Sequence, residues 1–183
     1  MSRNNCAKIL GSITVAACLL IPACGYTTKS ALPDRLQTVY VDHFDNKINY
    51  AADATGGRNV YFPLLEVELR DAVIERFQFD GNLSVIDSPE DADLVLDGAL
   101  VQYRRDALRF TDDNDAQEYR VQIVGKLELM DNAAGEPLWQ YDRFIGEATY
   151  FVTGAQASSE ESAVDEATTD LARRIVERTI ENW

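Results

Sequence analysis

The sequence is poor in cysteine and histidine, and both shortages limit the chemistry that the chain can perform. Its 183 residues include three cysteines, Cys6, Cys18 and Cys24, and one histidine, His43. Only Cys24 lies beyond the first 23 residues, so removal of that leader would leave a single thiol. A single thiol excludes a disulfide framework and any metal site built from several thiolates.

No catalytic set can be assembled around the one histidine. Asp42 and Asp45 flank His43, but no cysteine nucleophile remains once the leader is removed. A histidine at a strand end is more often a structural or surface residue. The acidic stretch 112–118 lacks the central glycine and the final glutamate of an EF-hand loop. We therefore expect no enzymatic activity, no metal and no cofactor.

Basic residues are also scarce. The chain has 17 Lys and Arg against 31 Asp and Glu, which gives a formal net charge of −14. Without Arg3 and Lys8, both in the leader, 15 basic residues remain against 31 acidic ones, a net charge of −16. This balance argues against binding to nucleic acid and against docking on anionic headgroups by charge alone.

The leader itself has the layout of an export signal. Arg3 and Lys8 precede an uncharged run over 9–23, and no acidic residue occurs before Asp34. A bilayer needs about 20 apolar residues, so this run is short for a transmembrane anchor or a long buried helix. Its charge order and its small final residue, Ala23, favour a signal peptide over 1–23 that is removed on export.

The residues that end this run resemble a bacterial lipobox. "IPAC" places a small residue directly before Cys24, whereas the competing match "VAAC" ends at Cys18. Cleavage before Cys18 would leave only nine hydrophobic residues after Lys8 and would strand "LLIPA" in the mature chain. We therefore predict lipidation at Cys24, where such signals add a diacylglycerol to the sulfur and an acyl chain such as palmitate to the amine.

Acylation at Cys24 would fasten the protein to a membrane without spanning it. Each buried methylene contributes about 0.8 kcal/mol, so two or three acyl chains hold a protein essentially permanently. The next residue is Gly25, which is compatible with delivery to the outer membrane under the enterobacterial sorting rule. We expect a lipidated tether over 24–35 and a lipid-anchored protein on the periplasmic side of the outer membrane.

The rest of the chain, 36–183, predicts a single domain. The alternation of apolar and polar residues indicates strands, and a period near 3.6 indicates helices. Expected strands cover 36–44, 83–87, 92–105, 118–130 and 137–152, and expected helices cover 62–77 and 158–183. Consecutive long strands with polar loops predict an antiparallel meander. The predicted fold class is therefore α+β, a two-layer sandwich in which two helices pack on one face of a mixed, mostly antiparallel sheet.

A smaller signal marks the start of the last helix. Ser158 and Glu161 have the spacing of a capping box, in which the serine side chain binds a backbone N–H at the start of the helix.

Several of the few cations fall on neighbouring expected strands. Arg104 and Arg105 end the first long strand, and Arg120 and Lys126 lie on the polar face of the next. Paired as a hairpin, these strands would gather the cations into a patch suited to a phosphorylated or carboxylated headgroup. Ordinary cross-strand pairing with nearby acids is the alternative. The candidate contacts for a glycolipid or partner are Arg104, Arg105, Arg120 and Lys126.

Five stretches in this order resemble the lipopolysaccharide-assembly lipoprotein family, LptE. They are "CGYTTKSALPDRLQTVYVDHFDNK", "VIERF", "DADLVLDGALVQYRRDAL", "EYRVQIVGKLELMDNAAGEPLWQ" and "EESAVDEATTDLARRIVERTIENW". The resemblance covers essentially the entire mature chain. It implies a non-catalytic protein that plugs a large β-barrel translocon, LptD-like, and assists its assembly. It also implies that the protein can contact lipopolysaccharide, which the translocon inserts into the outer leaflet.

The predicted function is accordingly that of a plug and assembly partner for this barrel. The alternative is a lipoprotein accessory subunit of another envelope lipid or polysaccharide export machine. A hydrolase is disfavoured because no nucleophile and base can be paired. The net charge of −16 would repel an anionic glycolipid at long range, so binding would need a local basic patch or bridging divalent cations.

Overall fold

A computed structural model of the chain describes residues 32–50 and 61–181. The predicted signal peptide, Cys24 and most of the tether lie outside the described residues and stay predictions. Within the described part, no helix is long and apolar enough to cross a membrane.

Six strands and two helices make up the described fold. In chain order they are β1 (Thr38–Val41), β2 (Asp45–Asn46), α2 (Leu65–Asp80), β3 (Ser84–Val85), β4 (Leu94–Phe110), β5 (Ala116–Asp131), β6 (Glu136–Phe151) and α3 (Glu160–Glu181). The predicted order of elements is confirmed, with two differences. β1 is shorter than the first expected strand, 36–44, and a separate two-residue strand, β2, lies just beyond that expected strand. β4 runs to Phe110, because its last residues still pair with β5.

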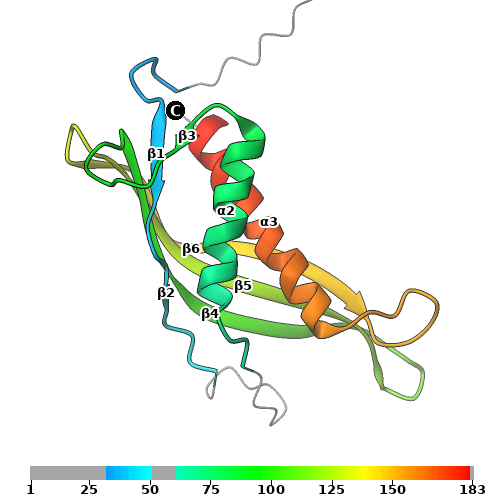
Figure 1. Ribbon diagram of the computed structural model, residues 1–183. Coiled ribbons are helices and arrows are strands. Elements are labelled where there is room, and N and C mark those ends of the chain that lie inside the picture. Colours follow the sequence, from blue (N-terminus) through cyan, green and yellow to red (C-terminus); the bar gives the residue numbers. More distant parts are fainter. Residues whose placement is uncertain (1–31, 51–60, 182–183) are drawn as a thin grey trace, which may run out of the picture.

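The sheet is mixed and mostly antiparallel. Its order is β3-β1-β4-β5-β6, and β2 also pairs with β4. β1 runs parallel to β3 and β4, whereas the long strands β4, β5 and β6 pair antiparallel. Figure 1 shows these long strands curving beneath α2 and α3, which both lie on one face. The predicted two-layer α+β fold is confirmed.

The core lies between the helices and the face of the sheet that they cover. In one row across the sheet, Leu96, Leu129 and Trp139 stand side by side, and all three are buried. On α2, the buried residues are Leu65, Leu69, Val73 and Phe77, the stripe at four-residue spacing that the sequence predicts. α3 adds a second stripe, which includes Leu171, Ile175 and Val176.

Helix α3 packs directly on the edge strand β6. A Cβ at Gly146 would lie 2.3 Å from the carbonyl oxygen of Ala167, so only glycine allows this approach. One carboxylate oxygen of Asp170 accepts a hydrogen bond from the backbone N–H of Glu147 at 3.1 Å. The outer edge of β6 is thus partly covered by α3, which protects it from pairing with another chain.

The two helices begin in different ways. α2 follows Leu64, whose φ of +63° is left-handed and which makes no side-chain cap. Before α3, the hydroxyl of Ser159 accepts a hydrogen bond from the N–H of Ser162 at 3.1 Å. The predicted capping box at Ser158 is therefore wrong by one residue, because the backbone N–H of Ser158 bonds to the carbonyl of Phe151.

Candidate functional site

The face of the sheet opposite the helices, called here the open face, carries most of the predicted cations. Side chains alternate between the two faces along a strand. Tyr103 and Ile123 stand opposite each other and are buried on the helix side. Arg104 and Gln122, one residue along each strand, therefore point to the open face, as do Arg120 and Lys126.

On this face the cations are partly paired with acids. The Nη2 atom of Arg104 lies 3.2 Å from Asp106, and Nζ of Lys126 lies 3.0 Å from Asp142. Arg120 stands directly opposite Asp106 in the register of β4 and β5. Its Nε is buried and has no hydrogen-bond partner in the described structure. The open face thus combines cations with acids. The pair of Lys126 and Asp142 joins two strands, whereas Arg104 and Asp106 belong to the same strand.

Arg105 does not join the other three candidates, because it points to the helix side of the sheet. Its Nη1 donates to Glu160 at 2.8 Å, and its guanidinium carbon lies 4.4 Å from the ring centroid of Tyr119. The hydroxyl of Tyr103 donates to the same carboxylate at 2.7 Å, and that of Tyr150 donates at 3.2 Å. Burial, and then this bond to Glu160, raise the pKa of Tyr103 far above its usual value. Arg105 therefore links the end of the sheet to the first turn of α3.

A fourth cation of the open face, Arg143, was missed by sequence reasoning. The register of β5 and β6 shifts between Gly125 and Leu127, which places Asp142 and Arg143 in a bulge. The Nη1 atom of Arg143 lies 3.5 Å from the side-chain oxygen of Gln102 on β4. Arg143 therefore reaches across β5, and Val124 beneath it is fully buried. Strand alternation could not reveal this placement, because the bulge adds residues to β6 that have no partner on β5.

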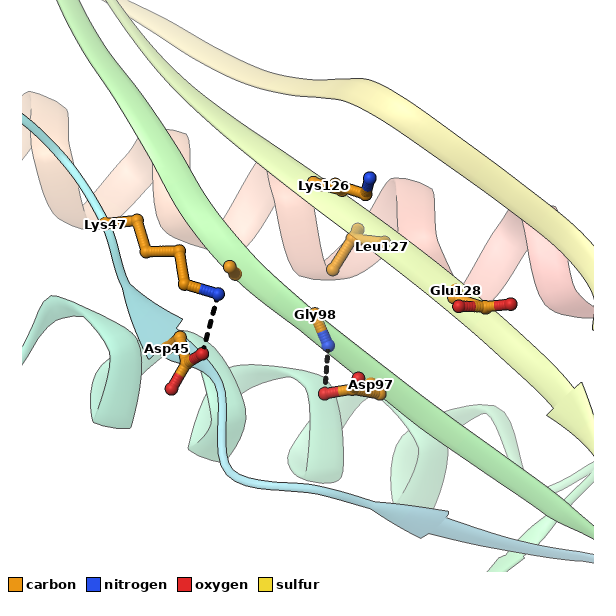
Figure 2. A pocket seen from close by; sticks show the side chains of 8 residues that line it. Asp45, Lys47, Asp97, Gly98, Lys126, Leu127 and Glu128 are labelled. Carbon is orange, nitrogen blue, oxygen red and sulfur yellow. Dashed lines mark hydrogen bonds and ion pairs between the residues drawn. The ribbon is translucent and has the colours of Figure 1, made fainter.

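A small pocket of about 130 Å³ opens beside these cations, where β2 meets β4 and β5. Lys126 and Glu128 of β5 border it, and so do Asp45 of β2 and Lys47, which lies directly after β2, as Figure 2 shows. The Nζ atom of Lys47 lies 2.8 Å from Asp45, and the N–H of Gly98 donates to the Asp97 carboxylate at 2.7 Å. Both signs of charge line the pocket, so it suits a polar group more than a strongly anionic one.

The one histidine lies on the surface of the described fold. His43 is exposed, and its backbone N–H donates to the carboxylate of Asp42 at 2.7 Å. Within residues 32–50 and 61–181, no cluster of three or more His, Cys, Asp or Glu side chains could hold a metal ion.

Comparison with known proteins gives a family match and a shared fold. The model of a family described as "LptE: Lipopolysaccharide-assembly" matches residues 36–179. No curated protein matches the chain.

Solved structures of low sequence identity share the fold. Uncharacterized lipoprotein B from Nitrosomonas europaea is 14% identical, with a TM-score of 0.53 over 81% of this chain and 84% of that one. The hypothetical protein CT253 from Chlamydia trachomatis is 13% identical, with a TM-score of 0.51 over 79% and 95%. Protein XCC0632 from Xanthomonas campestris is 16% identical, with a TM-score of 0.50 over 81% and 86%.

Proposed function

Because this chain belongs to the LptE lipopolysaccharide-assembly family, whose members are non-catalytic lipoproteins of outer-membrane biogenesis, we propose that it plugs and helps to assemble a β-barrel translocon. That translocon, LptD-like, inserts lipopolysaccharide into the outer leaflet. The observation that carries the proposal is the family match over residues 36–179, which spans the fold from before β1 into the last turn of α3.

The proposal includes the anchor. The signal peptide over 1–23 is removed, and acyl chains on Cys24 then hold the protein at the outer membrane by a tether over 24–35. The domain over 36–183 faces the periplasm and acts as a rigid, non-catalytic plug. A packed core, and a surface without a set of catalytic side chains among the described residues, fit such a role.

The proposed contacts with an anionic glycolipid are Arg104, Arg120 and Lys126. They share the open face, where guanidinium and ammonium groups can bind phosphate through charge-assisted hydrogen bonds. A phosphate would have to displace Asp106 from Arg104 and Asp142 from Lys126, or reach them through a divalent cation. Arg105 is left out of this set, since Glu160 already engages it on the other face.

Affinity purification from detergent-solubilised envelopes tests the proposed partner. The expected result is co-purification of one β-barrel protein of several hundred residues, identified by mass spectrometry. Recovery of an inner-membrane transporter instead would contradict the proposal and support the alternative of an accessory subunit in another export machine.

Binding of purified lipopolysaccharide tests the proposed glycolipid contacts. The double variant Arg120→Ala/Lys126→Ala should bind several-fold more weakly than the wild type, because two cations of the open face are lost. Arg109→Ala is the matched control, since Arg109 is exposed and pairs with Glu118 at 3.6 Å near the far end of β4. Equal affinities of the double variant and the wild type would remove these residues from the proposal.

A further inference from the structure

Cations follow a path around the outer edge of β6, from the open face to helix α3. Arg104, Arg120 and Lys126 lie on the open face, and Arg143 lies in the bulge of β6. Arg174 and Arg178 belong to α3, which packs on the other face of the sheet. We call these six residues the edge band.

The band is continuous where it turns the edge. Arg143 and Arg174 line one groove of about 360 Å³ together with Tyr141, Phe144 and Ile145. Asp142, which precedes Arg143, forms an ion pair with Lys126, and this pair joins the bulge to the open face. On the α3 side, the guanidinium carbon of Arg178 lies 5.3 Å from the ring centroid of Tyr141.

Half of the edge band has no acidic partner within the described part of the chain. For Arg120, Arg143 and Arg178, no carboxylate of the described residues lies within salt-bridge distance. Arg174 shares the carboxylate of Asp170 with Arg173. In a chain whose net charge is −14, three cations with no carboxylate at salt-bridge distance are available to an acidic partner. The surface that covers the edge band should therefore carry carboxylates.

The groove has the composition of a protein contact. Tyr141 and Phe144 both line it and meet edge to face, with ring centroids 5.5 Å apart. Tyrosine and arginine are among the residues that most often dominate the energy of protein interfaces. A half-buried pair of aromatic rings bordered by arginines is thus better suited to a protein partner than to solvent.

The shape of the band indicates what kind of partner it fits. A flat membrane surface could touch the open face or α3, but not both, because they lie on opposite sides of the sheet. A concave wall can enclose an edge and touch both sides. The lumen of an outer-membrane barrel is concave and polar. We propose that the edge band docks against a carboxylate-bearing stretch of the inner wall of the barrel, an inference that rests on the proposed function.

Charge reversal on each side of the edge tests this docking. Arg143→Glu and Arg178→Glu, each in the full-length lipoprotein, should lower the amount of barrel that co-purifies at least about tenfold, since close charge pairs across an interface are strongly coupled. Arg143→Lys should retain the barrel. Lys47→Glu is the matched control, because it makes the same change of charge directly after β2, next to β4 and away from β6, at a side chain that is 64% exposed.

The outcomes separate this inference from the proposed function. Barrel recovered equally with the wild type and with both reversal variants would overturn the edge band and leave the proposed function standing. No barrel with the wild type would overturn both. Loss of the barrel with Lys47→Glu as well would also overturn the docking. So would an Arg143→Glu variant that retains the barrel but no longer binds lipopolysaccharide. Equal thermal unfolding midpoints would show that the variants are folded.

Discussion

At Gly146, the missing side chain sets the distance between α3 and the sheet. A methyl group there would meet the carbonyl oxygen of Ala167 at 2.3 Å and the Cβ of Leu171 at 2.4 Å. Gly146→Ala should therefore lower the free energy of unfolding by about 1–3 kcal/mol, the usual cost of overpacking. Urea unfolding followed by circular dichroism measures this loss.

Gly125→Ala provides the control for that substitution. Its added Cβ would lie 3.5 Å from the nearest atom, Cγ of Leu127, which is an ordinary contact. We expect its stability to stay close to the wild type. Equal stabilities of the two alanine variants would mean that α3 does not press on β6 as described.

Glu160, in the first turn of α3, joins that helix to the sheet near Arg105. Its carboxylate accepts hydrogen bonds from Arg105, Tyr103 and Tyr150. Glu160→Gln should destabilise the protein by about 1–3 kcal/mol, because the half-buried guanidinium loses its counter-charge. Thermal unfolding checks this, with the exposed neighbour Glu161→Gln as control. Near-identical midpoints for both variants would contradict a role for Glu160 in joining α3 to the sheet.

Among the elements, helix α2 starts from an unfavourable residue. Leu64 has a left-handed backbone and a side chain that is 61% exposed. A left-handed conformation costs an L-residue about 1–2 kcal/mol, a cost that glycine largely avoids. Leu64→Gly should therefore raise stability by up to about 1 kcal/mol. A lower unfolding midpoint in that variant would show that the leucine side chain is needed in the folded protein.

Strand β1 is held at its start by two carboxylates. Backbone N–H donation from Gln37, followed by bonds from Thr38, lowers the pKa of Asp93. The hydrogen bond from Arg35, followed by the N–H of Ala134, lowers the pKa of Asp131. Both carboxylates therefore stay charged in the folded protein at a pH where they are protonated in the unfolded chain.

This difference predicts an acid-dependent loss of stability. The contribution is present above the ordinary carboxyl pKa of about 4, and it is lost as the pH falls through the lowered folded values. Asp93→Asn and Asp131→Asn should each lower stability at neutral pH and flatten its decline below about pH 4. Unfolding midpoints measured from pH 2 to 7 check this, and an unchanged slope would contradict the assignment.

The sequence predicted regular elements well and local irregularities poorly. The stripe on α2 and the alternation in β5 depend on periodicity, which the fold preserves. The bulge at Asp142 and Arg143 breaks the alternation of β6, so Arg143 could not be assigned to a face. The cap of α3 shifted from Ser158 to Ser159, because the backbone N–H of Ser158 donates a hydrogen bond to the carbonyl of Phe151.

At the scale of the whole molecule, the candidate site was predicted in part. Arg104, Arg120 and Lys126 share the open face as the pairing of two strands implies. Arg105 follows Arg104 directly and so points to the opposite face, where Glu160 of α3 lies. That contact joins residues 55 positions apart, which strand periodicity cannot reveal. The edge band likewise depends on α3 packing against β6.

The proposed anchor predicts how the whole protein is distributed in the cell. Cys24→Ser removes the sulfur that would receive the diacylglycerol, so the chain should keep its leader and should no longer be recovered with the outer membrane. Fractionation of the envelope and immunoblotting measure both effects. Outer-membrane recovery of a chain with wild-type mobility would contradict lipidation at Cys24.

Depletion of this chain from cells, followed by measurement of lipopolysaccharide on the cell surface, tests the central claim most directly. The account predicts that surface lipopolysaccharide and the amount of folded barrel fall together, and that both are restored by the wild-type chain. Unchanged surface lipopolysaccharide in depleted cells would contradict a role in lipopolysaccharide assembly.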